Sequence, residues 1–216
     1  MKLEQCQLDY LAERGGNYDR KYGMFNMLLG TIQEDIKSVI ELFGGTGIQT
    51  YYLNNKYNLD NHIVIDKDIR CCNCIKKFNN NVQVVNKNVF EYEDNKNYDL
   101  VVCDSVFNKK EFNNIVSLLD KFKSKYIIIT DTGVFNVRFN KNKTYDAYWN
   151  DMFYKLKERG YYILRIKYSS DFGMMLLTKI DYGLQDVSKL QKEEINTDWR
   201  NYRDLVLDYI KKGEIE

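Results

Sequence analysis

The 216-residue sequence contains no proline, one histidine and only five cysteines. The missing proline, together with abundant Asn and Lys, is typical of an AT-rich coding genome such as that of a phage, a virus or a low-GC bacterium. The cysteines are odd in number, and three of them crowd at Cys71, Cys72 and Cys74, which suits neither a disulfide framework nor paired zinc knuckles. Because His62 is the only histidine, a Cys/His metal site is not expected. We therefore expect reduced thiols and no bound metal.

The sequence also has no surplus of either charge and no long apolar run. Lys and Arg total 32 against 31 for Asp and Glu, so the net charge of +1 excludes a generally basic, polyanion-coating protein. No apolar stretch approaches the roughly 20 residues of a membrane helix, and the first residues do not resemble a signal peptide. We expect a cytoplasmic protein of a prokaryote or of a virus-infected host cell, with no membrane partner.

The length of the chain suits one α/β domain with short additions. The 44% of hydrophobic residues can bury one substantial core. We expect an amino-terminal helical cap at 1–36, the main domain at 37–182 and a carboxyl-terminal helical extension at 183–216. In the extension an apolar stripe is formed by Trp199, Tyr202, Val206, Tyr209 and Ile210. Packing of this stripe on the domain is expected and a dimer contact is the alternative, so the chain is a monomer or a homodimer.

Short runs rich in Val and Ile alternate with amphipathic stretches, which is typical of a parallel sheet covered by helices. The predicted strands are Ser38–Phe43, His62–Asp66, Val82–Val85, Tyr98–Cys103, Tyr126–Thr130, Tyr161–Tyr168 and Gly173–Lys179. The predicted helices between the first five strands are Ile48–Tyr57, Asp68–Asn79 and Lys109–Lys123.

The last two predicted strands are separated by only Ser169-Ser170-Asp171-Phe172. This link is too short for a parallel crossover, so the two strands must form an antiparallel hairpin. The pattern therefore predicts a seven-stranded, mostly parallel sheet that ends in an antiparallel hairpin.

A glycine turn follows the first predicted strand in the run Glu41-Leu42-Phe43-Gly44-Gly45-Thr46-Gly47. Gly45 and Gly47 let the backbone bend and approach a ligand, and the next helix presents its amino terminus to that ligand. A dinucleotide-binding turn needs a third glycine where Thr50 stands. The run resembles the acid-x-(Gly or Phe)-x-Gly-x-Gly turn of class I S-adenosylmethionine-dependent methyltransferases. This resemblance spans Lys37 to Lys179 and implies a Rossmann-like fold with S-adenosylmethionine as cofactor.

Three later positions agree with the resemblance. Asp66 ends the second predicted strand, where a carboxylate can accept hydrogen bonds from both ribose hydroxyl groups. Capping of the next helix is the alternative role for Asp66. Asn88 and Val89 follow the third strand, where the family commonly has Asp-Ala beside the adenine, and an Asn in a turn is the alternative. Asp104, at the end of the fourth strand, would face the path of the methyl group. The cofactor-binding residues implied in this way are Lys21, Glu41, Phe43, Gly45, Gly47, Asp66, Lys67, Asn88, Val89 and Asp104.

The methyl acceptor is not evident from a motif. The adenine-specific DNA enzymes carry (Asp or Asn)-Pro-Pro-aromatic after the fourth strand, where this chain has Asp104-Ser105-Val106-Phe107. Cytosine-C5 enzymes need a Pro-Cys nucleophile, but no proline precedes Cys103, which we assign to the core. Methyltransferases that modify the ribose 2′-O carry a lysine at the end of the fifth strand, where this chain has Thr130-Asp131. We expect Asp104 and Asp131 to lie near the acceptor.

Phe43 is shared with many nucleic-acid methyltransferases, and two segments combine aromatic and basic residues suited to stacked bases and phosphates. These residues are Tyr18, Arg20, Lys21, Tyr22 and Phe25 in the first segment, and Phe135, Arg138, Lys141, Lys143 and Tyr145 in the second. Nucleic acid is therefore the favoured acceptor. Simple packing of the aromatic residues, a small-molecule or protein acceptor, and a catalytically silent cofactor-binding subunit are the alternatives.

Overall fold

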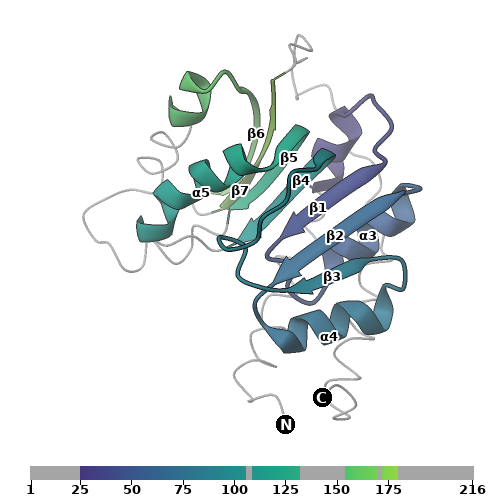
Figure 1. Cartoon of the computed structure of the whole chain (residues 1–216). Helices are drawn as coiled ribbons and strands as arrows, with labels where there is room; N and C mark the ends of the chain where they lie inside the picture. The colour runs from purple at the N-terminus through teal and green to yellow at the C-terminus, as the bar shows by residue number, and fades with distance from the viewer. Residues whose placement is uncertain (1–24, 106–108, 132–153, 170–171, 180–216) are drawn as a thin grey trace.

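A computed structural model describes residues 25–105, 109–131, 154–169 and 172–179 of the chain (Figure 1). Within these residues the strands form one seven-stranded sheet in the order β3-β2-β1-β4-β5-β7-β6. The strands are β1 Ser38–Leu42, β2 Asn61–Asp66, β3 Gln83–Asn86, β4 Asn97–Ser105, β5 Lys123–Asp131, β6 Tyr162–Ser169 and β7 Phe172–Thr178. The labelled helices are α3 Ile48–Lys56, α4 Ile69–Phe78 and α5 Lys109–Lys121, and residues 25–31 and 154–158 are also helical.

The direction of the strands confirms the predicted fold class. The pairs β1 with β2, β1 with β4, β2 with β3 and β4 with β5 are all parallel. Strand β7 pairs antiparallel with both β5 and β6, and only two residues separate β6 from β7. The chain leaves β1 toward β2 and β3 and then crosses back to β4 on the other side of β1. The carboxyl ends of β1 and β4 therefore flank a topological switch point, where open α/β sheets bind ligands.

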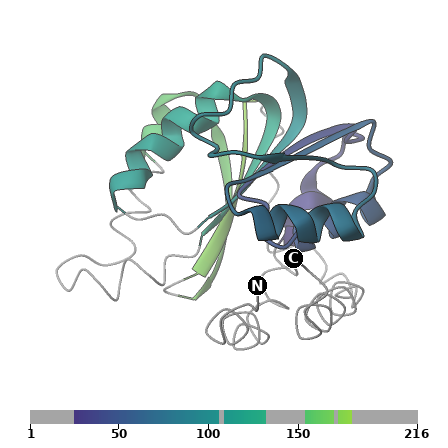
Figure 2. The same cartoon turned by 60° about the horizontal axis from the view of Figure 1, so that its bottom comes forward.

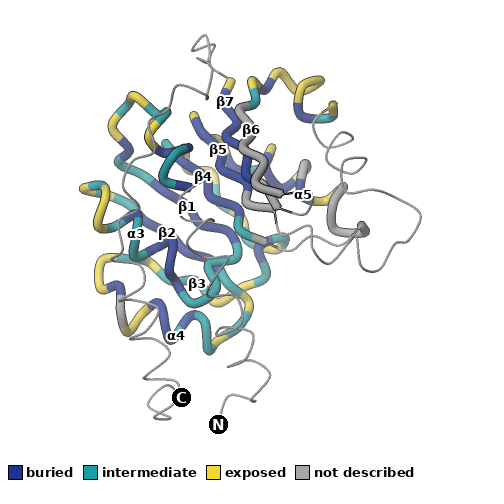
Figure 3. The backbone as a smooth tube through the Cα atoms, turned by 180° about the vertical axis from the view of Figure 1, so that it is seen from behind, coloured by how far each residue is buried: buried dark blue, intermediate teal, exposed yellow. Residues whose placement is uncertain are grey.

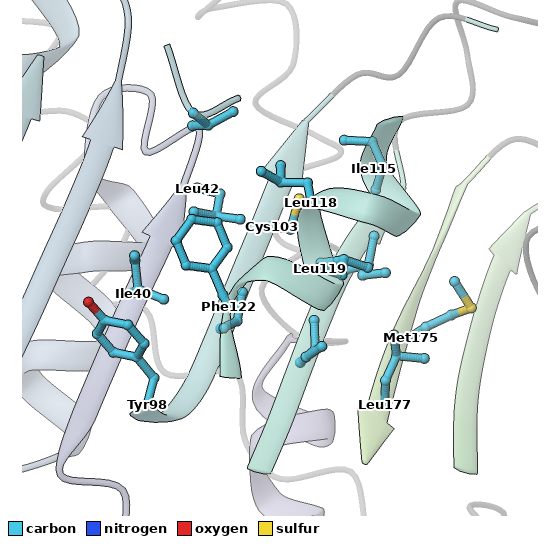
Figure 4. Packing of buried hydrophobic residues seen from close by; sticks show 14 of the residues in the cluster. Ile40, Leu42, Tyr98, Cys103, Ile115, Leu118, Leu119, Phe122, Met175 and Leu177 are labelled. Carbon is cyan, nitrogen blue, oxygen red and sulfur yellow. The ribbon is translucent and has the colours of Figure 1, made fainter. Parts of the chain in front are cut away.

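Two apolar layers cover the faces of the sheet. On one face α5 packs through Ile115, Leu118 and Leu119 against the central strands, and Phe122, which directly follows the helix, joins the same cluster (Figure 4). The other face is covered by Phe25, Leu28 and Leu29 of the first described helix and by Leu53 of α3. In Figure 2, α4 and α5 lie on opposite sides of the sheet. In Figure 3 the central strands are dark blue, because β1 is buried from Val39 onward and β2 is buried from His62 to Ile65. Burial on both faces is the reason these strands appear as continuous apolar runs in the sequence.

Helix α4 shows how local sequence sets the bounds of an element. Its N-cap is Asp68, whose Oδ1 accepts a 3.0 Å hydrogen bond from the backbone N–H of Arg70. Cys72, Cys74 and Ile75 are buried, and basic residues occupy the last turn, where they complement the helix dipole. The alternative role of Asp66, capping of this helix, is therefore taken by Asp68, which is the first residue of the helix predicted from the sequence.

The predicted bounds differ most from the structure at β5. The helix predicted to Lys123 ends at Lys121, and β5 begins at Lys123, three residues before the predicted start. Lys123 and Ser124 join the strand because they pair with Asn97 and Tyr98 of β4. Polar residues at the end of a sheet give no apolar signal, so only the partner strand identifies them as β-structure.

The structure describes only part of the additions predicted at the two ends of the domain. Phe25, Leu28 and Leu29 are fully buried against the sheet. The tail stripe and the rest of the terminal extensions lie outside the described residues, so the three-part division of the chain stays a prediction. Among the described cysteines Cys71, Cys72, Cys74 and Cys103 are free thiols. No described helix is long and apolar enough to cross a bilayer.

Candidate functional site

The turn from Phe43 to Gly47 is fastened to the end of β2 by backbone hydrogen bonds. The N–H groups of Phe43 and Gly44 both donate to the carbonyl oxygen of Ile65, at 2.9 and 3.2 Å. The N–H of Gly47 donates to the carbonyl of Gly44 at 3.0 Å and closes the turn. Phe43 has a φ of 65°, a left-handed conformation that costs a non-glycine residue about 1–2 kcal/mol. The first glycine position of the motif is thus filled by a residue under backbone strain.

Three glycines of the turn serve different needs. A Cβ added to Gly44 would lie 2.1 Å from Cγ1 of Val64 on β2, so only a glycine lets the turn approach the sheet. A Cβ at Gly45, whose φ is 55°, would meet nothing within 4 Å, so this residue faces open space. Gly47 has a φ of 82° and is the N-cap of α3. The backbone bend predicted at Gly45 and Gly47 is present in their positive φ angles, whereas the need for Gly44 follows only from the position of Val64.

Asp66 lies at the end of β2 and reaches back to the turn. Its Oδ2 accepts a 2.8 Å hydrogen bond from the N–H of Gly45, and its Oδ1 accepts a 2.8 Å hydrogen bond from the N–H of Asp68. The side chain is half-buried. An ionised carboxylate offers about four acceptor positions, so each oxygen can still accept one more hydrogen bond. Asp66 is therefore both a support of the turn and an acceptor at the open edge of the sheet.

Glu41 points away from solvent and into a buried polar cluster. Its side chain is 1% exposed, and Oε1 lies 2.5 Å from Nε2 of His62, whose side chain is fully buried. The other ring nitrogen of His62, Nδ1, lies 2.8 Å from Oδ1 of Asn54 on α3. Oε2 of Glu41 is buried and has no hydrogen-bond partner among the described residues. The sequence gives no sign that His62 pairs with Glu41, because the two residues are 21 positions apart and meet only through the register of β1 and β2.

The residues after β3 form a turn whose side chains hold one another. Oδ1 of Asn88 accepts a 3.2 Å hydrogen bond from the N–H of Phe90, and its Nδ2 donates to Glu91 at 3.3 Å. Val89 is 2% exposed and packs in the core. Phe90, which the sequence analysis did not single out, meets Phe43 edge to face with ring centroids 6.1 Å apart. The turn role that the sequence left open for Asn88 is present, and its carbonyl oxygen keeps a second lone pair.

Asp104 and Asp131 lie at the same edge of the sheet as the glycine turn. Leu42, the last residue of β1, pairs with Cys103, so Asp104 lies one position beyond the end of β1. Ser105 pairs with Asp131, which ends β5. Asp66, Asp104 and Asp131 thus come from neighbouring or nearby parallel strands at their carboxyl ends.

Of the two predicted lysines, Lys67 is exposed beside Asp66, and Lys21 lies outside the described residues. Of the residues proposed for the aromatic and basic segments, the structure describes Phe25. Its ring is fully buried, with its centroid 5.8 Å from that of Tyr52. For Phe25 the structure supports the alternative of simple packing. The other members of both segments lie outside the described residues.

Cys103 is not available as a nucleophile. It is fully buried, and burial raises the pKa of its thiol well above the usual range, with the nearby charge of Asp104 adding to the shift. The thiol therefore stays protonated, as its assignment to the core predicts. The part of the chain that the structure describes contains no group of three or more His, Cys, Asp or Glu side chains that could hold a metal ion.

Solved structures with this arrangement of strands and helices are numerous, although no protein-family model and no curated protein sequence matches the chain. The plantazolicin methyltransferase BpumL, in complex with a monoazolic desmethylPZN analog and SAH, superposes with a TM-score of 0.61 at 14% identity, covering 82% of this chain and 89% of BpumL. The methyltransferase domain of bacterial CtHen1-CN gives 0.60 at 13% identity, covering 74% and 98%. The ribosomal protein L11 methylase of Lactobacillus delbrueckii subsp. bulgaricus gives 0.55 at 10% identity, covering 74% and 78%.

The chain has the class I methyltransferase fold. The predicted Rossmann-like fold class is therefore confirmed, both by the sheet order and by these neighbours. In a class I methyltransferase fold the glycine turn follows the first of the parallel strands, which is where Phe43 to Gly47 lie. Of the residues predicted for the site, Phe43, Gly45 and Gly47 form this turn, Asp66 is hydrogen-bonded to it, and Asp104 lies one position beyond the end of β1. Their roles toward a ligand stay a prediction.

Proposed function

We propose that the protein is a methyltransferase that uses S-adenosylmethionine. The observation that carries the proposal is the hydrogen bond from the N–H of Gly45 to Asp66, which ties the end of β2 to the turn that follows β1, next to the switch point of the sheet. This pairing sets a half-buried carboxylate beside a glycine whose Cβ position is open. A ribose can approach the carboxylate there, and a glycine lets the rest of a nucleoside come close to the backbone.

The residues at this edge fit the cofactor. Asp66 has acceptor capacity left for two ribose hydroxyls, and the buried Oε2 of Glu41 lacks a donor that an amino group would supply. Phe43 and Phe90 form a partly buried aromatic wall next to the turn, suited to a purine. When bound, S-adenosylmethionine would supply the methyl group of its sulfonium. The methyl–sulfur bond breaks as the acceptor bonds to the methyl group, and S-adenosylhomocysteine is left.

The chain's own contribution to this reaction is binding and alignment, because transfer from a sulfonium is an in-line displacement that needs few catalytic groups. Asp104 and Asp131, at the ends of β4 and β5, are the proposed contacts to the acceptor. Either carboxylate can accept a proton or a hydrogen bond from an acceptor amine or hydroxyl. Asn88, Val89, Lys67 and Lys21 complete the proposed cofactor set.

Titration calorimetry with S-adenosylhomocysteine tests the proposal. We expect binding by the wild type, and a loss of at least about tenfold in affinity for Asp66→Ala, because two charge-assisted hydrogen bonds are lost. Asp60→Asn is the matched control, since Asp60 is exposed and precedes β2 at the opposite edge of the sheet. Absence of binding by the wild type, or equal affinity of Asp66→Ala and wild type, contradicts the proposed cofactor.

We propose nucleic acid as the acceptor. Support comes from Phe43 and from the aromatic and basic segments of the sequence, apart from Phe25, which is buried. The names of the neighbours do not favour one acceptor, since they include a ribosomal protein methylase and a plantazolicin methyltransferase. Transfer of an isotope-labelled methyl group to fractions of a cell extract reports the acceptor class and the activity together. Label in the nucleic-acid fraction, with oligonucleotide affinity that falls steeply with salt, is the expected result.

The other outcomes correspond to the alternatives. Label in protein or small molecules, together with a flat salt response, replaces the nucleic-acid acceptor and keeps the enzyme. Cofactor binding without transfer to any fraction, together with co-purification of a partner chain, identifies a catalytically silent cofactor-binding subunit.

A further inference from the structure

In the described part of the chain, buried polar atoms without a hydrogen-bond partner occur in the strand before the glycine turn and in the helix after it. Four buried side-chain atoms lack a hydrogen-bond partner among the described residues, and three of them belong to Glu41, Gln49 and Thr50. These residues lie on the two sides of the turn, at the end of β1 and in the first turn of α3. The fourth belongs to Ser124 near the start of β5. A buried polar group without a partner costs about 1–3 kcal/mol, so the unpartnered Oε2 of Glu41, two residues before the glycine turn, points to a polar ligand.

The carboxylate of Glu41 is held by one oxygen only. His62 occupies Oε1 at 2.5 Å and is itself held from the other side by Asn54 at 2.8 Å. The parallel register brings these groups together, because Val39 pairs with His62 and Glu41 lies two residues farther along the same face of β1. Because His62 engages Oε1, Oε2 is the oxygen of this carboxylate that is left for a ligand.

We propose that His62, supported by Asn54, is a positioning residue that directs Oε2 of Glu41 toward the α-ammonium group of the cofactor. The inference rests on the proposed function and adds how the amino-acid end of the cofactor is recognised. An imidazole N–H on Oε1 fixes the orientation of the carboxylate, and an ammonium group donates to Oε2 and satisfies it. His62 acts only through Glu41, and so it should affect the amino-acid end of a ligand and not its adenosine end.

Two ligands separate these ends. S-adenosylhomocysteine carries the α-amino acid, whereas 5′-methylthioadenosine shares the nucleoside and the thioether and lacks the amino acid. Removing the ring with His62→Leu should weaken S-adenosylhomocysteine at least about tenfold in calorimetry and leave 5′-methylthioadenosine within about twofold. His62→Gln, which keeps an N–H donor within reach of Oε1, should restore most of the lost affinity.

The controls address folding and coupling. Ile63→Val truncates a buried side chain on the same strand without touching the cluster, and it should change the affinity of neither ligand. If His62→Leu does not fold, His62→Asn replaces it, because its short amide can face Asn54 but does not reach Oε1. In a Glu41→Gln background either His62 variant should produce much less than its effect in the wild type, since the two residues act as a unit.

The outcomes are distinct. Equal weakening of both ligands by the His62 variants overturns the positioning role and assigns His62 to general stability, while the proposed function stands. No weakening of either ligand also overturns the role. If the wild type binds neither ligand, the proposed function fails and this inference fails with it.

Discussion

The carboxylate of Asp66 accepts a hydrogen bond from the backbone N–H of Gly45, with 2.8 Å between Oδ2 and N. This contact joins residues that are 21 positions apart and ties the end of β2 to the turn after β1. It makes the shape of the turn and the position of the acceptor carboxylate depend on each other. Substitutions at this edge should therefore change the free energy of unfolding and the affinity for a ligand to different extents.

Ligand-induced stabilisation should depend on Asp66. S-adenosylhomocysteine at 100 times its Kd should stabilise the wild type by about 2.7 kcal/mol, seen as a higher unfolding midpoint. Asp66→Ala, with an affinity at least about tenfold weaker, should lose about half of this shift or more at the same ligand concentration, and Asp66→Asn, which keeps one acceptor oxygen, should lose less. A full shift in Asp66→Ala, measured by differential scanning fluorimetry, contradicts the assignment.

Gly44 should tolerate no side chain unless Val64 is shortened. Gly44→Ala places a Cβ 2.1 Å from Cγ1 of Val64, so we expect a loss of about 1–3 kcal/mol from overpacking. Combining it with Val64→Ala should cost less than the sum of the single substitutions, because the clash is removed. Urea unfolding of the three variants measures the coupling, and strict additivity would mean that the turn shifts to avoid the contact.

At position 43 a glycine should leave the protein more stable than an alanine, which is the reverse of the usual order. Its φ of 65° is unfavourable for alanine and free for glycine, and both substitutions lose the edge contact with Phe90. We therefore expect Phe43→Gly to be about 1 kcal/mol more stable than Phe43→Ala. Urea unfolding of both variants measures this difference. A more stable alanine variant would show that the backbone leaves the left-handed conformation when the ring is removed.

Asp99 should contribute a pH-dependent part of the stability. At the amino-terminal edge of the sheet its Oδ2 accepts hydrogen bonds from the N–H groups of Lys37 and Ser38 and from the hydroxyl of Ser38, at 2.9–3.0 Å. Burial raises the pKa of Asp99, but these hydrogen bonds and Lys125 outweigh burial and hold the pKa below its usual value.

Because the pKa of Asp99 is lower in the folded state, its stabilisation is complete above about pH 4 to 5, beyond the usual carboxyl value. It is lost as the pH falls through the folded pKa. Asp99→Asn should reduce the free energy of unfolding at pH 7 and flatten its decline at acid pH. Unfolding curves of both proteins from pH 7 to about pH 3 measure the difference, and parallel curves would exclude Asp99 as the source.

The sequence predicts the elements of this fold better than the contacts between them. The central strands β1, β2 and β4 were recognisable because burial on both faces leaves a dense apolar run. The start of β5 was not, since Lys123 and Ser124 are strand residues only through their pairing with β4. The position of Asp66 at the carboxyl end of the sheet could be predicted because it directly follows the apolar run of the second strand.

Two contacts could not be predicted from the sequence. They are the pairing of Glu41 with His62 and the close approach of Gly44 to Val64. Both depend on the register between β1 and β2, which pairs Glu41 with Val64. A single-residue slip would place different side chains together, and nothing local in the sequence fixes that register. For Asn88 the two possible roles, turn and ligand contact, use the same residue type, so the sequence alone left them open.

The bonds that hold the turn also set an order of events in folding. Three successive N–H groups, those of Phe43, Gly44 and Gly45, all find their acceptors on Ile65 and Asp66 at the end of β2. The turn therefore cannot take its final form until β2 has docked beside β1, and a transition state that lacks this docking has no site to stabilise. A bound nucleoside should then slow unfolding while leaving the refolding rate unchanged.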